Sequence, residues 1–68
     1  MKITLKAMRV NSNLTQSEVA KKAGISKSTL INWENNKTSP TAVQFCRLCE
    51  IYGCSTKDIF LPIELAKS

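Results

Sequence analysis

Apolar residues recur at helical spacing along most of the chain, and residues that start or stop helices separate the runs. No stretch alternates apolar and polar residues in the way that is typical of a strand. We therefore expect an all-α protein of five helices. Their expected ranges are about 3–12, 16–23, 27–35, 40–52 and a short last helix that contains Ile59 and Phe60 and ends before Pro62.

Short polar side chains mark the expected helix starts. Thr15 with Glu18, and Ser55 with Asp58, have the spacing of a capping box, in which each side chain accepts the backbone N–H of the other residue. The other expected N-caps are Ser26 and Ser39, the latter followed by Pro40 as the first helical residue. Residues that tolerate positive φ are expected to stop the helices: Asn13, Gly24, Asn36 and Gly53.

The apolar faces of these helices define an expected core. Its members are Leu5, Met8, Val19, Ala20, Ala23, Ile25, Leu30, Trp33, Leu48, Cys49, Tyr52, Ile59, Phe60 and either Val43 or Phe45. On the opposite face of the third helix lie Lys27, Ser28, Ile31 and Asn32, which we expect to face solvent or a partner.

The length of 68 residues leaves room for one small domain, which we place at 1–63, with a tail at 64–68 that is expected to fray. Histidine is absent, and none of the five carboxylates belongs to a recognisable acid–base pair. We therefore expect no enzyme, no cofactor and no metal. No apolar run approaches the roughly 20 residues of a membrane span, so we expect a cytoplasmic protein without a membrane partner.

The positive charge is concentrated in the first half of the chain. The net charge is +5, and residues 1–38 contain seven basic and two acidic side chains, whereas residues 39–68 contain three of each. A basic half on a small domain attracts polyanions. No predicted helix combines a basic face with a broad aromatic one, so nucleic acid is favoured over a membrane surface.

The pair of helices between residues 16 and 35 has the features of a helix-turn-helix. Ala20 is small where two helices must cross closely, and Gly24 occupies the turn between them. An ordinary αα-hairpin needs the same two features, so it remains the alternative from spacing alone.

With the flanking residues included, the chain resembles the helix-turn-helix domain of the phage Cro and repressor proteins and the bacterial regulators similar to them. The matching residues are Leu14, Thr15, Gln16, Ala20, Gly24, Ile25, Ser26, Trp33, Glu34, Asn35, Ser39, Pro40 and the segment 53–60. The resemblance implies a compact five-helix bundle of the lambda repressor-like type, whose second and third helices form the helix-turn-helix. Asn13 and Asn36 stand where the family usually has glycine.

The resemblance places Lys27, Ser28 and Asn32 at positions that contact bases in the major groove, with Ile31 beside them. Lysine can donate to guanine, asparagine can pair with adenine, and isoleucine can pack on a thymine methyl group. Lys27 also lies at the positive end of a helix dipole, a small cost that a phosphate or a guanine would relieve. The alternatives are an exposed lysine and an exposed isoleucine without a role.

The resemblance also supports two further sets of expected site residues. Phosphate contacts are expected at the start of the second helix and, through side chains and free amides, in the loop after the third: Gln16, Asn35, Asn36, Lys37 and Thr38. Arg9 is expected to pair with Glu34 as a structural ion pair, because family members join the first and third helices in this way.

We therefore expect a sequence-specific transcription regulator that binds a double-stranded DNA operator as a repressor or activator, and as a homodimer at least on DNA. The surface near the last helix, with Phe60, Leu61 and Ile63, is the expected site of dimerisation or of another protein partner. One alternative is an antitoxin-like module that uses DNA binding only for autoregulation. Another is a metal- or redox-sensing regulator that uses Cys46, Cys49 and Cys54.

Overall fold

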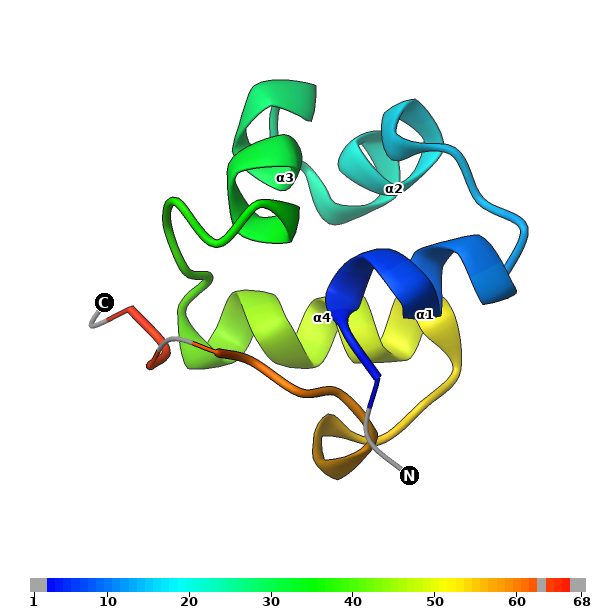
Figure 1. Ribbon diagram of the computed structural model, residues 1–68. Coiled ribbons are helices and arrows are strands. Elements are labelled where there is room, and N and C mark those ends of the chain that lie inside the picture. The colour runs from blue at the N-terminus through cyan, green and yellow to red at the C-terminus, as the bar shows by residue number, and fades with distance from the viewer. Residues whose placement is uncertain (1–2, 63, 67–68) are drawn as a thin grey trace.

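A computed structural model describes residues 3–62 and 64–66 of the chain (Figure 1). In this part of the chain there are four α-helices and one turn of 3-10 helix, and no β-strand longer than an isolated bridge. The helices are α1 (Leu5–Asn11), α2 (Gln16–Ala23), α3 (Lys27–Glu34) and α4 (Ala42–Tyr52), and the 3-10 turn is η1 (Thr56–Asp58).

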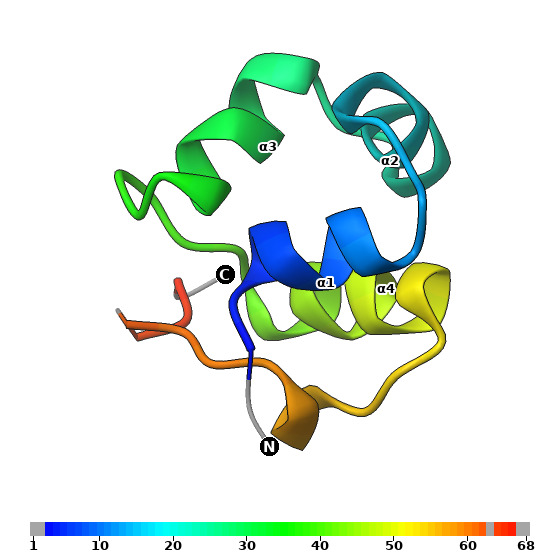
Figure 2. The ribbon, with the colours of Figure 1, turned by 45° about the vertical axis from the view of Figure 1, so that its right-hand side comes forward.

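The helices form two layers. In Figures 1 and 2, α2 and α3 lie together on one side of the molecule, and α1 and α4 lie on the other. The longest helix, α4, contacts both α2 and η1, and α1 contacts α3. The core between the layers consists of Leu5, Val19, Leu30, Trp33, Phe45, Leu48, Cys49, Tyr52 and Ile59. Most of the expected core is therefore confirmed, with Phe45 inside and Val43 outside.

The helix boundaries follow from the caps that the sequence predicts. Thr15 accepts the N–H of Glu18 at 3.1 Å, and Ser26 accepts that of Thr29 at 3.1 Å. The residues expected at positive φ have it: Asn13 (57°), Gly24 (71°), Asn36 (61°) and Gly53 (69°). Asparagine thus takes the left-handed conformation at two helix ends where glycine is usual in the family.

The prediction of a fifth α-helix was wrong. Its place is taken by the single turn η1, after which Ile59 is extended (φ −110°, ψ 130°) and 51% of Phe60 is exposed. Ile3, expected within the first helix, is extended as well and pairs with Ile59 as a parallel bridge. The backbone of Ile3 is satisfied by the two residues that flank Ile59, because its N–H donates to the carbonyl of Asp58 at 3.0 Å and its carbonyl accepts the N–H of Phe60 at 2.7 Å.

The expected start of the fourth helix was also wrong. Its N-cap is Thr41, which forms a capping box with Gln44 through two hydrogen bonds of 2.9 and 3.2 Å. Ser39 and Pro40 precede the helix instead of beginning it. Pro40 is fully buried, and the hydroxyl of Ser39 is buried without a hydrogen-bond partner in the described part of the chain.

The segment after Pro62 returns to the start of α4, where the N–H of Ala66 donates to the carbonyl of Pro40 at 2.9 Å. The expected fraying of residues 64–68 stays a prediction, and residues 67 and 68 lie outside the described part. None of the described helices is both long and apolar enough to span a membrane.

The two candidate caps of α4 predict different mutational effects. Thr41→Ala removes a capping hydrogen bond and should lower the free energy of unfolding by about 1 kcal/mol. Ser39→Ala removes a buried hydroxyl without a partner, so it should leave stability unchanged or raise it slightly. Urea denaturation of both variants measures this, and an equal loss in the two would contradict the assignment of the cap.

Candidate nucleic-acid interface

The four predicted base-contacting residues lie along one outward strip of α3. Lys27 and Ser28 are exposed in the first turn, and Ile31 and Asn32 are half-buried one turn later. The hydroxyl of Ser26 accepts the N–H of Thr29, which fixes the start of the helix from which these side chains project.

The direction of α3 is set by packing against α2. Leu30 and Trp33 point inward and are 0% and 4% exposed. At the crossing, Ala20 is buried, and the N–H of Ile25 donates to its carbonyl at 3.0 Å across the left-handed Gly24. The outward strip of α3 is therefore held on a rigid support, as a docking surface for a groove of DNA requires.

Arg9 of α1 and Glu34 of α3 form the predicted ion pair. Arg9 Nε lies 2.7 Å from Glu34 Oε2, and Arg9 Nη2 donates to Oε1 at 3.3 Å. The side chains are only 12% and 2% exposed. The hydrogen bond to Glu34 raises the pKa of Arg9 against the opposing effect of burial. A third donor, Nη1, bonds the carbonyl of Leu14 at 3.0 Å.

A third member of this cluster was not predicted. The side-chain amide of Gln16 donates to Glu34 Oε1 at 3.1 Å, so Glu34 connects α1, α2 and α3. One amide hydrogen of Gln16 is thereby used, and the other remains for a phosphate oxygen. Gln16 and Glu34 are 18 positions apart, so no local spacing signal could have revealed this contact.

An open hollow of about 560 Å³ lies beside this cluster, between α1 and the starts of α2 and α3. It brings together the predicted residues Gln16 and Lys27 with Lys6, which the sequence analysis did not single out. The full lining is Lys6, Arg9, Val10, Asn13, Leu14, Thr15, Gln16, Ser17 and Lys27. Three cationic side chains around a hollow suit an anionic backbone.

The capping box predicted at the N-terminus of α2 is present. In its capping box, Thr15 donates its backbone N–H to the Glu18 carboxylate at 2.9 Å and accepts the N–H of Glu18. These bonds lower the pKa of Glu18, chiefly through the backbone N–H of Thr15. The stabilisation from this carboxylate is therefore present above its usual pKa of 4.5 and is lost as pH falls below it.

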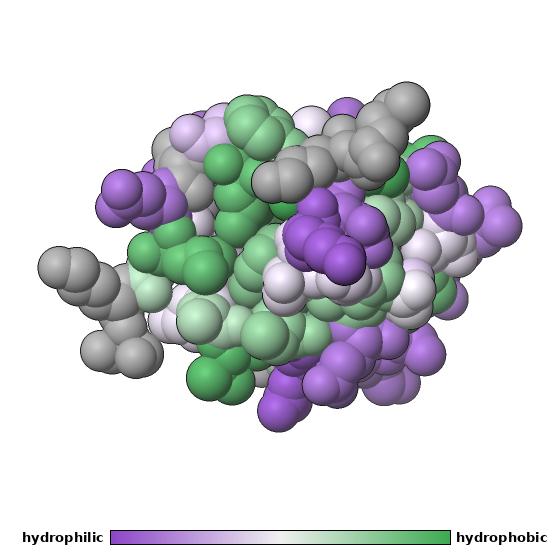
Figure 3. Space-filling model, turned by 90° about the horizontal axis from the view of Figure 1, so that it is seen from below, coloured by the Kyte–Doolittle hydropathy of each residue, from purple (hydrophilic) through white to green (hydrophobic). Residues whose placement is uncertain are grey.

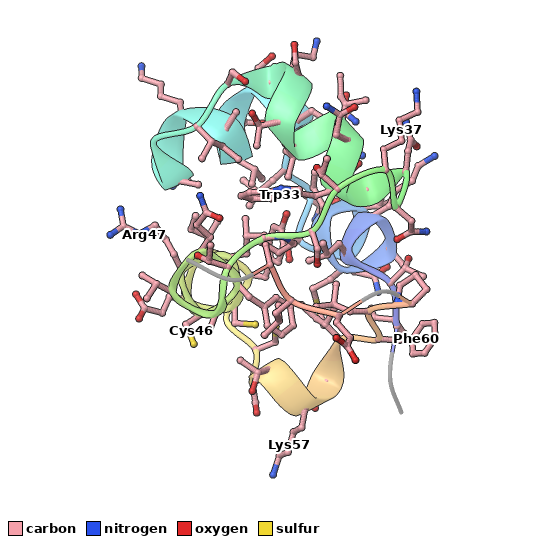
Figure 4. All side chains as sticks on the ribbon, turned by 90° about the vertical axis from the view of Figure 1, so that its left-hand side faces the viewer. Trp33, Lys37, Cys46, Arg47, Lys57 and Phe60 are labelled. Atoms are coloured by element: carbon pink, nitrogen blue, oxygen red, sulfur yellow. The ribbon has the colours of Figure 1, made fainter. Side chains whose placement is uncertain are left out.

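The loop after α3 lies at the opposite end of that helix from Lys27. All four predicted phosphate-contacting residues of this loop, Asn35, Asn36, Lys37 and Thr38, are exposed. The expectation of free amides was wrong, because all four N–H groups donate to carbonyls of α3. Contacts from this loop therefore fall to the side chains, and that of Lys37 projects away from the molecule (Figure 4).

The expected protein-contacting residues at the C-terminal segment differ in exposure. Phe60 is 51% exposed, whereas Leu61 packs against the core, and Ile63 lies outside the described residues. On the face seen from below in Figure 3, apolar side chains gather mainly in the left-hand part of the view.

The three cysteines differ in their surroundings. Cys46 is exposed, Cys49 is buried and Cys54 is intermediate. Burial, followed by the nearby Cys54 thiol, raises the pKa of Cys49 to about 12. Among the described residues, no three Cys, Asp or Glu side chains are grouped so that they could hold a metal ion.

Comparisons with known proteins agree with this geometry. A family model described as helix-turn-helix matches residues 5–59. An uncharacterized HTH-type transcriptional regulator of Methanocaldococcus jannaschii is 38% identical over 61 residues, which are 90% of this chain and 92% of that protein. A regulator of the same description from Archaeoglobus fulgidus is 28% identical over 90% of this chain and 86% of its own length. Antitoxin HipB of Escherichia coli is 39% identical over 46 residues, 68% of this chain and 52% of HipB.

The Arg9–Glu34 pair predicts a large stability loss on truncation. Arg9→Ala leaves the buried Glu34 carboxylate with only Gln16 as a partner, so we expect a loss of about 2–3 kcal/mol in the free energy of unfolding. Lys21→Ala, which removes an exposed charge, is the control and should change stability by less than about 0.5 kcal/mol. Denaturation midpoints that coincide for the two variants would show that the Arg9–Glu34 pair contributes no more to the free energy of unfolding than an exposed charge does.

The cysteine environments predict a clear order of reactivity. Cys46 should react first with a thiol reagent near neutral pH, and Cys49 should react only as the domain unfolds, because its thiol is buried and protonated. The fast phase of labelling by the thiol reagent, which we assign to Cys46, should disappear in Cys46→Ser. Rapid labelling of Cys49 in the folded protein, read by mass spectrometry, would contradict this order.

Proposed function

Because the chain belongs to the helix-turn-helix family, as the match over residues 5–59 shows, we propose that it is a sequence-specific DNA-binding transcription regulator that places α3 in the major groove. The observation that supports this most directly is the outward strip of α3, Lys27, Ser28, Ile31 and Asn32, held rigidly beside the cationic hollow. Its activity is binding without chemistry, in the cytoplasm, and its most direct effect is repression by competition with polymerase.

The contacts divide into two classes. Lys27, Ser28, Ile31 and Asn32 contact base edges, and so decide the sequence that is bound. Gln16 and the side chains of Asn35, Asn36, Lys37 and Thr38 contact phosphates and set the position of the domain on the duplex. The Arg9–Glu34 pair acts indirectly, because Glu34 also holds the side chain of Gln16.

Operator binding by two copies is part of the proposal. Two domains on half-sites one helical turn apart, roughly 34 Å, would double the contacts and so raise specificity. Selection of bound sequences from a random duplex library at physiological salt tests this. We expect two related half-sites about 10 base pairs apart, favoured roughly 1,000-fold over a scrambled duplex. No enrichment would refute sequence-specific binding.

Single substitutions test the two classes of contact. Asn32→Ala should lose about 1–3 kcal/mol at one or two base pairs and leave binding to random DNA unchanged. Lys37→Ala should weaken binding to all sequences alike and lower the salt slope by about 1. Lys57→Ala removes the same charge from η1, far from Lys37 in Figure 4, and should change neither quantity. If Asn32→Ala weakened binding to the selected duplex and to random DNA equally, Asn32 would have no role in base contact.

A second candidate function is supported by the similarity to HipB, a protein named as an antitoxin. An antitoxin-like protein binds another protein and uses DNA to regulate its own synthesis. The half-exposed Phe60 is the surface we propose for such a partner. A companion protein that co-purifies with the wild-type chain and is lost in Phe60→Ser would support this function.

A further inference from the structure

A small cavity lies between α4 and the turn that joins α2 to α3. Its volume is about 170 Å³. It is lined by Ala23, Gly24, Ile25, Trp33, Val43, Gln44 and Arg47. None of these residues belongs to the outward strip of α3, to the loop after α3 or to the cationic hollow. The cavity is therefore separate from the surface that we propose for DNA.

The walls of the cavity are mostly apolar. Ala23 and Ile25 lie on the two sides of the turn, and Trp33 of α3 is 4% exposed. Val43 of α4 is 72% exposed and stands at the edge. An apolar cavity of roughly 150 Å³ has room for one benzene molecule. The size and the walls of this cavity therefore fit an apolar group of about one aromatic ring.

The two long polar side chains of the lining offer hydrogen-bond donors. Gln44 Oε1 accepts the N–H of Thr41 at 2.9 Å in the capping box of α4, so the side-chain NH2 group of Gln44 is the part that remains available. Arg47 is exposed and has donors only. The ion pair among the described residues is Arg9–Glu34, so Arg47 keeps its charge for an outside partner. Of the described residues, none that lines the cavity is acidic.

We propose that this cavity binds a small carboxylic acid whose apolar part is about the size of one aromatic ring. The ring lies between the turn and α4, and the carboxylate stays at the rim, where Arg47 and the amide of Gln44 donate to it. A guanidinium group can hold both oxygens of a carboxylate through two parallel hydrogen bonds. This inference goes beyond DNA binding and does not depend on it.

The location of the cavity allows ligand and DNA to bind at the same time. Figure 4 shows Arg47 on the outer side of α4, with Lys37 and Phe60 on the opposite side of the molecule. The outward strip of α3 stays uncovered, because it shares no residue with the cavity. A bound ligand would instead connect α4 to the turn of the helix-turn-helix.

Benzoate is the probe for this site, and Trp33 supplies the signal. Trp33 is the only tryptophan of the chain and lines the cavity, so a ring bound there should change its fluorescence. Excitation at the red edge of the indole absorption avoids absorption by benzoate. A ligand with so few atoms binds weakly, and we expect a saturable change with a dissociation constant of about 1 mM.

Two control compounds separate the ring from the charge. Benzyl alcohol has the same ring without the charge and should bind at least about tenfold more weakly than benzoate. Acetate has the charge without the ring and should give no saturable change over the same range. Sodium chloride keeps the ionic strength equal in all three titrations.

Two variants and one control variant test the position of the carboxylate. Arg47→Gln should weaken benzoate binding at least about tenfold and leave benzyl alcohol binding unchanged. Val43→Asp adds a negative charge at the exposed edge and should weaken benzoate binding at least about threefold by repulsion. Lys57→Gln removes a positive charge from η1 and should change neither. Circular dichroism checks that each variant keeps its helices.

Amide resonances in a two-dimensional NMR spectrum show where benzoate binds. The shifts should centre on Ala23, Gly24 and Gln44. Shifts that centre on Lys6 and Gln16 would place benzoate in the cationic hollow and overturn the inference. The inference is also overturned if benzoate gives no saturable change, if benzyl alcohol binds as tightly, or if Arg47→Gln binds benzoate as the wild type does. Selection of DNA sequences is measured without benzoate, so its result bears on the proposed function alone.

Discussion

The Glu34 carboxylate is the group on which the arrangement of the domain depends. It is 2% exposed, so its charge must be balanced by donors inside the protein. Arg9 from α1 and Gln16 from α2 supply them, and Arg9 also bonds the carbonyl of Leu14 in the connection between those helices. Three helices are thereby fixed around one charge at the end of α3. The predicted phosphate-contacting residue Gln16 and the predicted base-contacting strip of α3 share this anchor.

Much of the fold could be predicted because its signals are local. A capping box spans four residues, and a residue at positive φ ends a helix by its own conformation, so Thr15, Ser26, Asn13 and Asn36 were assigned from the sequence. The inward faces of α2 and α3 followed from periodicity in the same way. The family resemblance supplied the Arg9–Glu34 pair, since no local pattern joins residues 25 positions apart.

The errors arose where a tertiary contact outweighed a local signal. Ser55 and Asp58 have the spacing of a helix start, but pairing of Ile3 with Ile59 holds the following residues extended. Ser39–Pro40 resembles a helix start, but burial of Pro40 and the Thr41–Gln44 box move the start of α4 two residues along. The predicted free amides of the loop after α3 donate to α3 itself. The roles assigned to individual DNA-contacting residues stay predictions, because they depend on a partner that the chain does not contain.

The pairing of Ile3 with Ile59 also bears on the order in which the chain folds. These residues are 56 positions apart (59 minus 3), so the entropy cost of closing this loop is among the largest in the domain, whereas each helix forms from near neighbours. During synthesis from the N-terminus, α1 to α4 can assemble around Glu34 before Ile59 is available to pair. The Ile3–Ile59 pairing should therefore form last in folding and separate first in unfolding, so that partial opening begins there and leaves the helix-turn-helix intact.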